Sequence, residues 1–510
     1  MDGHSLISPG LLLAIVVGYF AVLVGISFLT AGKGDNDTFF KAGKSSPWYL
    51  VAWGMIGASL SGVTFVSIPG VVGAGGLNQQ LSYMQVVFGY LFGYLFIATV
   101  LLPLYYRLGL TSIYEYLAER FGHSSYLTGA AFFQLSRIIG ASFRLYLVAI
   151  VLDLFVLGPL GFPVWGTVAI TLLLIYIYTF KGGMRTVVYT DTLQTFAMLA
   201  AVLVSLYALT SNLGGDLLSM PLLVMESGLD QMFFFGGGWT DPNNFWKQFF
   251  SGALITIVMT GLDQDMMQKN LTCRSLGDAQ KNVFSLSVLL IPINLIFLSL
   301  GILLYSNMQM LDLEIPAKAD QIFPTMALSH LPPIAGITFV IGLIAAAYSS
   351  ADSALTSLTT SFCVDFLGFD REDGVEQGSQ NKTRNIVHIG FAVVLFVVIL
   401  IFYALNDDSV INSLFRIAGL TYGPLLGLFA FGLSNRRPLR DKLVPIVCVL
   451  APLLTWLIDK NSVAWLGGFQ FGFLLLALNG FLTYVGLWLL SVGATNLREA
   501  IPVDLQIDRT

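Results

Sequence analysis

The chain has 510 residues, of which 56% are hydrophobic and only 11% charged, and its mean hydropathy is +0.78. A soluble domain must keep a charged surface in contact with water, so this composition excludes one and indicates a protein that lies in a lipid bilayer. The formal net charge of −5 and the lack of any run rich in Lys or Arg exclude a nucleic-acid partner.

Thirteen apolar runs are long enough to cross the hydrocarbon of a bilayer, which is about 30 Å thick and takes roughly 20 helical residues. No basic residue precedes Lys33 and no small-residue cleavage site is present, so we expect the first run to be a retained helix with its N-terminus outside. The predicted spans are residues 9–30, 48–73, 81–105, 124–156, 163–180, 189–211, 247–268, 283–305, 334–366, 386–405, 412–433, 443–459 and 467–491.

The Lys and Arg residues give the orientation of these spans, because cytoplasmic connections of membrane proteins are rich in both. With the N-terminus outside, three of the 25 basic residues lie inside spans and three on the outer side, which leaves 19 for the cytoplasmic connections and a cytoplasmic tail at 492–510. The glycosylation sequons begin at Asn36, Asn270 and Asn381, all on the cytoplasmic side, which favours a bacterial plasma membrane. No connection is long enough for a soluble domain, so residues 1–510 are predicted to form a single membrane domain.

The second span is interrupted by small and polar residues, namely Gly57, Ser59, Ser61, Gly62, Thr64 and Ser67. A helix broken at this depth frees backbone carbonyls, which are hard oxygen ligands for a hard cation, and it points the ends of its half-helices at ions and substrates. The same residues also fit a small-residue packing face whose hydroxyls bond to their own helix. The span alone leaves both interpretations open.

Hydroxyl groups also line one face of the ninth span. At about 100° per residue, a stripe roughly 100° wide contains Ala346, Ser349, Ser350, Ser353 and Ser357, with Asp352 beside it. Hydroxyl and carboxylate oxygens without His or Cys favour an alkali or alkaline-earth ion over a transition metal. The alternative is a zipper of hydroxyls between helices, which a buried carboxylate disfavours because of its cost in a membrane.

Three further ionisable residues lie in or at the ends of spans. Asp191 enters the sixth span from the cytoplasmic side, where it either caps the helix or completes an ion site with Ser353. Arg137 and Arg144 are seven residues apart on one face of the fourth span, with Arg137 about 15 Å deep. A guanidinium at this depth needs an anion, either an internal Asp or a substrate carboxylate that it grips with two parallel hydrogen bonds.

The sequence does not favour an enzyme. None of the four His residues lies mid-span where it could act as a base, and no Walker-type Gly-rich loop is present for an ATP-driven pump. Cys273, Cys363 and Cys448 are widely spaced, so they indicate neither a disulfide framework nor a zinc site.

Asp263 and Asp265, toward the cytoplasmic end of the seventh span, fit gating or helix-end roles as well as ligand roles.

Three motifs, in this order along the chain, resemble the sodium:solute symporter family: Gly57-Ala-Ser-Leu-Ser-Gly-Val-Thr, Tyr189-Thr-Asp-Thr-Leu-Gln and Ala346-Ala-Tyr-Ser-Ser-Ala-Asp-Ser. The resemblance covers nearly the whole chain. Within the family, Ser61-Gly-Val-Thr-Phe-Val-Ser-Ile-Pro and Thr111-Ser-Ile-Tyr-Glu-Tyr-Leu are most similar to bacterial sodium/sialic acid symporters.

The resemblance implies an all-α polytopic membrane protein with a LeuT-like fold. Inverted five-helix repeats would span approximately 48–211 and 247–433, with accessory helices at 9–30 and 443–491. It also implies two ion sites. The shared sodium site of the family would use the carbonyls of Gly57, Leu60 and Ala346 and the hydroxyls of Ser349 and Ser350.

A second sodium site, found in some members, would use Asp191, Ser349 and Ser353. Asp352 stands beside it, where the sialic acid carriers have a serine. For the substrate, the resemblance points to the hydroxyls of Ser59, Ser61 and Thr64, to Gln85 as a pocket glutamine, and to Arg137 as the carboxylate-binding arginine.

The implied activity is sodium-coupled uptake of a small organic solute. The first candidate for this solute is a sugar acid or other carboxylate such as sialic acid. A neutral sugar or polyol is the second candidate. A proton-coupled carrier of the same fold is the remaining alternative, because Asp191 and Asp352 could titrate. The expected partners are sodium ions, the substrate and the lipid bilayer, and we expect the chain to be monomeric.

Overall fold

The computed structural model describes residues 7–30, 39–40, 42–73, 75–179, 183–369, 377–405 and 410–492. In lipid every backbone polar group must be satisfied within the protein, and helices do this locally. The principal helices are α1 (Pro9–Thr30), α3 (Trp48–Val71), α4 (Tyr83–Phe96), α5 (Leu102–Leu108), α6 (Glu115–Arg120), α7 (His123–Leu152), α8 (Val164–Thr179), α9 (Gly183–Asn212), α10 (Met220–Glu226), α11 (Phe245–Thr256), α12 (Gln264–Leu271), α13 (Leu276–Met310), α14 (Ile322–Thr325), α15 (Pro333–Ser361), α16 (Gln377–Leu405), α17 (Val410–Thr421), α18 (Gly423–Ser434), α19 (Val444–Trp465) and α20 (Leu475–Ser491).

Ten helical segments in the described part of the chain are long and apolar enough to cross a membrane, and two bent helix pairs bring the number to as many as 12. The remaining predicted span, 163–180, corresponds to α8, whose 16 residues are fewer than the roughly 20 that a crossing takes. The predicted count of thirteen spans is therefore not confirmed, whereas the all-helical membrane architecture is confirmed.

Three of the spans are interrupted by a change in backbone direction. In α3 the interruption is at Ser61, whose φ of 46° and ψ of 172° are not helical. The helical segment that ends at Gly261 and the following α12 differ in direction by 63°, and α17 and α18 differ by 44°. The first of these breaks agrees with one of the two interpretations that the small polar residues of the second span left open. The other two were not predicted.

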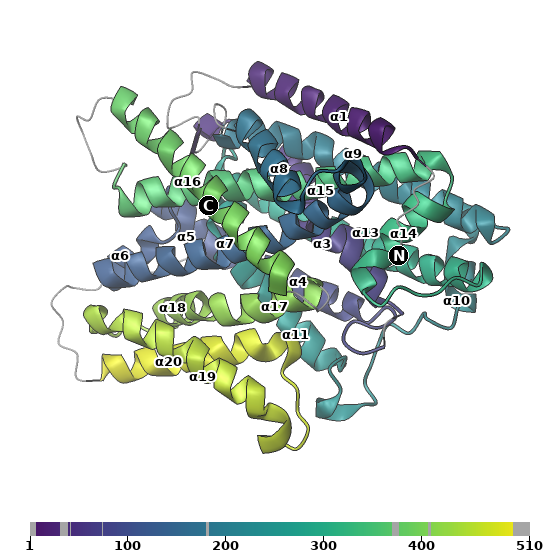
Figure 1. Ribbon diagram of the computed structural model, residues 1–510. Helices are drawn as coiled ribbons and strands as arrows, with labels where there is room; N and C mark the ends of the chain where they lie inside the picture. The colour runs from purple at the N-terminus through teal and green to yellow at the C-terminus, as the bar shows by residue number, and fades with distance from the viewer. Residues whose placement is uncertain are drawn as a thin grey trace.

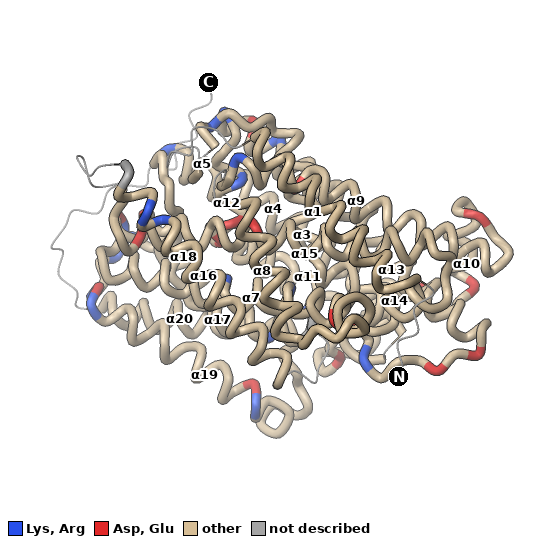
Figure 2. The backbone as a smooth tube through the Cα atoms, turned by 45° about the horizontal axis from the view of Figure 1, so that its top comes forward, with Lys and Arg blue, Asp and Glu red and all other residues tan. Residues whose placement is uncertain are grey.

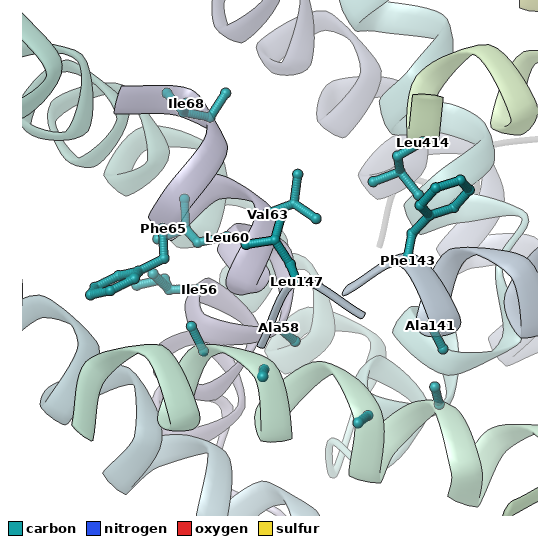
Figure 3. Close-up of a cluster of buried hydrophobic side chains, with 14 of the residues drawn as sticks. Ile56, Ala58, Leu60, Val63, Phe65, Ile68, Ala141, Phe143, Leu147 and Leu414 are labelled. Carbon is teal, nitrogen blue, oxygen red and sulfur yellow. The ribbon is translucent and has the colours of Figure 1, made fainter. Parts of the chain in front are cut away.

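The centre of the molecule is α15, which is packed against α9, α3 and α7. Figure 1 shows α3 and α15 in the interior, with α1 along one edge and α19 and α20 along the opposite edge. Both halves of the broken α3 are anchored by buried apolar side chains, including Ile56 and Leu60 before the break and Phe65 and Ile68 after it (Figure 3). The break is thus held on both sides by the core.

The charges are distributed unevenly along the molecule. Figure 2 shows Lys and Arg gathered near α5 and α12, at the end opposite to α10, where the connections carry Asp and Glu. This asymmetry is the one on which the predicted orientation rests.

Candidate functional site

The break in α3 lies directly against α7 and α15. Ser61 is in the left-handed region of backbone conformation, which costs a residue other than Gly about 1–3 kcal/mol. At the next residue, Gly62, an added Cβ would lie 3.5 Å from Val148 and 3.6 Å from the carbonyl oxygen of Arg144. These are ordinary van der Waals distances, so the backbone after the break packs directly on α7.

The half of α3 before the break packs on α9 and α15 through Gly57. Its N–H donates to Thr195 Oγ1 at 3.1 Å, and an added Cβ would lie 3.3 Å from Ser349 Oγ. The structure thus places the Gly57 backbone beside the hydroxyl stripe of α15.

The oxygens of the first predicted sodium site lie on these two facing segments. Ser350 Oγ donates to the Ala346 carbonyl at 3.4 Å, and Leu60 is buried on the same stretch of α3 as Gly57. Ser349 is fully buried near the Asp191 carboxylate, yet its hydroxyl makes no hydrogen bond of good geometry. A buried hydroxyl normally has a partner. This oxygen, beside the Gly57 backbone, fits a hard monovalent cation.

The residues of the second predicted sodium site are engaged by other groups. Lys269 Nζ, from α12, lies 2.6 Å from Asp191 Oδ2, and both side chains are buried. Asp352 accepts hydrogen bonds from Tyr178 at 2.9 Å and from the N–H of Ser353 at 2.6 Å. An ammonium on the main carboxylate ligand means that these residues do not fit a sodium ion in this arrangement.

Lys269 was missed as a site residue by sequence reasoning. The sequence places it in the cytoplasmic connection 269–282, whereas the structure places it inside α12 with 1% of its surface exposed. That prediction was wrong, because the helix continues past the end of the apolar run.

A cavity of about 90 Å³ lies at the break. Its wall includes Ser59, Ser61 and Thr64 of α3, Tyr83, Tyr90 and Tyr94 of α4, and Arg137 and Arg144 of α7. The apolar part of this wall includes Val63 of α3 and Leu414 of α17, which are buried (Figure 3). The three tyrosines were also missed, although their spacing of seven and four residues places them on one face of α4.

Gln85 is not on the cavity wall. It is fully buried, its amide nitrogen donates to the Asn243 carbonyl at 2.9 Å, and its amide oxygen accepts from the N–H of Phe234 at 3.0 Å. Both ends of the amide are therefore committed to the connection before α11 and not to a substrate.

Arg137 lines the cavity but is paired with internal carboxylates. It forms an ion pair with Asp265, and its Nη1 is 3.9 Å from Asp263 Oδ2. Asp263 also accepts from the N–H of Asp265 at 2.9 Å, which caps the start of α12. Of the two anions that the sequence allows for Arg137, the structure supplies the internal Asp.

Arg144 is the second guanidinium on the cavity wall. Only 8% of its surface is exposed, and its Nε has no hydrogen-bond partner. Among the described residues no carboxylate forms an ion pair with it. The nearby Asp263 is already bonded to Tyr422 and close to Arg137. Arg144 is thus a buried cation that faces the cavity without a counter-ion.

The profile of the sodium:solute symporter family matches residues 39–437. The chain belongs to this family. It is therefore a sodium-coupled symporter and not an enzyme, with sodium ions and a small-molecule substrate as its partners. As a family member with many apolar helices and bacterial relatives, it is a multi-pass inner-membrane protein.

Several members of the family are similar over most of their length. The sodium/sialic acid symporter NanT of Aliivibrio fischeri is 25% identical over 477 residues, covering 90% of each chain. The sodium/sialic acid symporter SiaT of Proteus mirabilis is 26% identical over 461 residues, 86% of this chain and 88% of SiaT. The sodium-coupled monocarboxylate transporter 1 of Mus musculus is 26% identical over 432 residues, 80% of this chain and 66% of that protein.

Solved structures share the fold. A Na⁺-coupled sialic acid symporter in a substrate-bound outward-open state matches with a TM-score of 0.80 at 19% identity, covering 96% of this chain and 99% of the other. The nucleobase-cation-symport transporter Mhp1 matches with a TM-score of 0.56 at 15% identity, over 92% of this chain and 98% of the other. The fold is therefore that of the LeuT-fold transporters.

Proposed function

We propose that this symporter takes up a small organic acid, either a sugar acid such as sialic acid or a smaller monocarboxylate. The observation that carries the proposal is Arg144, a buried guanidinium without a counter-ion on the wall of the cavity. A guanidinium binds a carboxylate through two parallel charge-assisted hydrogen bonds, which are among the strongest polar contacts that a protein makes.

The remaining polar groups of the cavity suit a hydroxylated acid. Ser59 Oγ is buried near the Tyr94 hydroxyl without a hydrogen bond of good geometry, and Ser61 and Thr64 lie on the same wall. The similarity to sialic acid symporters and to a monocarboxylate transporter supports the same class, because both kinds of substrate carry a carboxylate. A neutral sugar or polyol is the alternative, and it would leave the charge of Arg144 unmatched.

The size of the cavity limits the substrate. Its volume of about 90 Å³ is below the roughly 300–1,000 Å³ of typical small-molecule sites. A sugar acid therefore requires the cavity to widen when it binds, whereas a short monocarboxylate needs less room. Comparing the uptake of sialic acid with the uptake of short monocarboxylates shows whether the cavity widens for a sugar acid.

For coupling, we assign one sodium ion to the carbonyls of Gly57, Leu60 and Ala346 and the hydroxyls of Ser349 and Ser350. Sodium at this position bridges the first half of α3 to α15, while the residues at and after the break face the substrate cavity. Filling one site then favours filling the other, and the effect is reciprocal: if sodium raises substrate affinity, substrate raises sodium affinity by the same factor.

We further propose that two inverted repeats, 48–211 and 247–433, surround the site. Each repeat begins with a broken span, α3 in the first and the α11–α12 pair in the second, and discontinuous helices in matching positions of two repeats are typical of such transporters. In this scheme the helices at 9–30 and 443–491 are accessory, the N-terminus is outside, α8 makes the thirteenth crossing, and the chain works as a monomer.

Uptake into proteoliposomes made with the purified protein tests the proposal. Sialic acid, short monocarboxylates and uncharged analogues such as the corresponding amides are supplied with sodium or with choline in its place. We expect uptake of one class of acid that requires sodium and is not inhibited by the amide.

Uptake of a neutral sugar in preference to every acid contradicts the substrate class. Acid uptake that persists in choline and follows a pH gradient favours the proton-coupled alternative, in which Asp352 is the carboxylate to examine.

A further inference from the structure

The contact between Lys269 and Asp191 removes the main ligand of the second predicted sodium site. Lys269 Nζ is 2.6 Å from Asp191 Oδ2, with 2% of the lysine side chain and 1% of the aspartate side chain exposed. The other carboxylate oxygen also has a donor, because Gln194, with its amide nitrogen turned toward it, donates to Asp191 Oδ1 at 3.2 Å. Both oxygens of the carboxylate are therefore used within the protein.

The other members of the predicted site are used as well. Ser353 Oγ donates to the Ser349 carbonyl at 3.1 Å and lies 3.2 Å from Asp265 Oδ2. The Asp352 carboxylate accepts from Tyr178 at 2.9 Å and lies 3.4 Å from the hydroxyl of Thr190.

We propose that the ammonium of Lys269 takes the place of the second sodium ion, so that this chain couples transport to a single sodium ion at the first site. The inference extends the sodium-coupled function proposed above, but the number of bound sodium ions does not depend on which substrate is carried.

The location of Lys269 explains how a tethered cation can do this. The residue lies on α12, the short helix that follows the break after α11, and it connects α12 to Asp191 on α9. The first half of α3 packs on Asp191, since a Cβ added to Gly54 would lie 2.9 Å from the Cβ of Asp191. The ammonium therefore joins α12 to α9, as a bound ion would, but it is never released.

Charge also argues against a further ion here. Asp191 and Lys269 form a neutral pair, and a sodium ion that approached the carboxylate would meet the ammonium a few ångströms away in a medium that screens charge weakly. Replacing the ammonium by an uncharged side chain of similar length removes this repulsion and leaves a carboxylate near the hydroxyl of Ser349.

The experiment counts ²²Na⁺ bound to the purified full-length protein at pH 8 without any substrate, so it does not depend on the proposed substrate class. We expect one sodium ion per protein in the wild type and in Lys269→Arg, which keeps the cation. We expect two in Lys269→Met, in which Asp191 is free to bind an ion.

The double variant Lys269→Met/Asp191→Asn loses both charges together, leaves no unpaired buried charge, and should return to one ion. Two ions bound to the wild type overturn the proposal. One ion bound to Lys269→Met also overturns it, provided that this variant is folded, as shown by cooperative unfolding and by a sodium-dependent gain in thermal stability. If Lys269→Met does not fold, the counts for the wild type and the double variant decide the question, and two ions in either one overturn the proposal.

Discussion

Arg137 and Arg144 lie two helical turns apart on α7 and both reach the same cavity, but only Arg137 has carboxylate partners. The ion pair with Asp265 ties α7 to the start of α12 at the second broken span. Arg144 has no such tie among the described residues, and its charge is balanced only when an anion enters the cavity. We therefore propose different roles for two identical side chains on one helix face, Arg137 in holding the site and Arg144 in recognising the substrate.

Replacing Arg144 by Gln should weaken the binding of a carboxylate substrate by about 10- to 100-fold. A hydrogen bond to a charged group contributes about 1.5–3 kcal/mol, which corresponds to that range. Binding of the acid and of its amide, measured by isothermal titration in detergent with sodium present, checks this. Arg144→Lys should lose less affinity than Gln because it keeps the charge. Unchanged affinity for the acid in Arg144→Gln would show that the carboxylate is bound elsewhere.

Replacing Arg137 by Gln should act mainly on stability. Removing one partner of a buried ion pair leaves an uncompensated charge and costs about 3–5 kcal/mol. The apparent midpoint of thermal unfolding in detergent should fall, and the double variant Arg137→Gln/Asp265→Asn should recover much of the loss because the orphaned carboxylate is gone. A single variant that is as stable as the wild type but fails to bind acids would instead make Arg137 the carboxylate-binding residue.

The proposed sodium site on α15 makes separate predictions for its hydroxyls. Ser349→Ala and Ser350→Ala should each raise the sodium concentration for half-maximal response several-fold, by analogy with the roughly 1 kcal/mol of a lost polar contact. Ser357 is the matched control, because it is buried on the same helix with its hydroxyl bonded to the Ala354 carbonyl at 3.0 Å. Sodium titrations that follow thermal stability measure all three. Equal shifts in Ser357→Ala and Ser350→Ala would mean a general loss of packing rather than loss of a ligand.

Much of the fold was predictable because it depends on local composition. Apolar runs of membrane-spanning length locate the helices, and small polar residues at membrane depth allow either the break in α3 or a packing face at the same place. The break before α12 was not predicted, although Thr260 and Gly261 lie just before it and Asp263 fits a helix-end role. It forms where Asp263 accepts hydrogen bonds from the first N–H groups of α12, and its other oxygen meets Tyr422, a residue of the distant α17–α18 junction.

The site was less predictable because its charges pair over long distances in the sequence. Helical periodicity puts Arg137 and Arg144 on one face, but the partner of Arg137 lies 128 residues away and that of Asp191 lies 78 residues away. A single sequence carries no record of such pairings. Lys269 was assigned to a connection for the same reason, since hydropathy alone does not distinguish a lysine at a helix end in water from one paired inside the core.

The predicted orientation can be tested with single cysteines. The native cysteines Cys273, Cys363 and Cys448 are all buried, so replacing them by serine gives a background without reactive thiols. Lys460→Cys and Arg437→Cys then report opposite ends of the molecule, and both positions are exposed. A membrane-impermeant maleimide should label position 460 in intact cells and position 437 only after permeabilisation. The reverse pattern would invert the proposed topology.

The proposed single sodium ion has an electrical consequence for a monovalent acid. One sodium ion moving with one carboxylate carries no net charge, so the membrane potential should not drive uptake. With two sodium ions, one net charge would cross, and each charge contributes about 2.3 kcal/mol per 100 mV, or roughly a 50-fold change in accumulation.

Potassium gradients with valinomycin, imposed on proteoliposomes at a fixed sodium gradient, measure how uptake depends on the membrane potential. Wild-type uptake of the acid should be equal at zero and at −100 mV, whereas Lys269→Met, if it binds a second ion and still transports, should respond to voltage. Strong voltage dependence of acid uptake in the wild type would show that more than one sodium ion moves with each substrate.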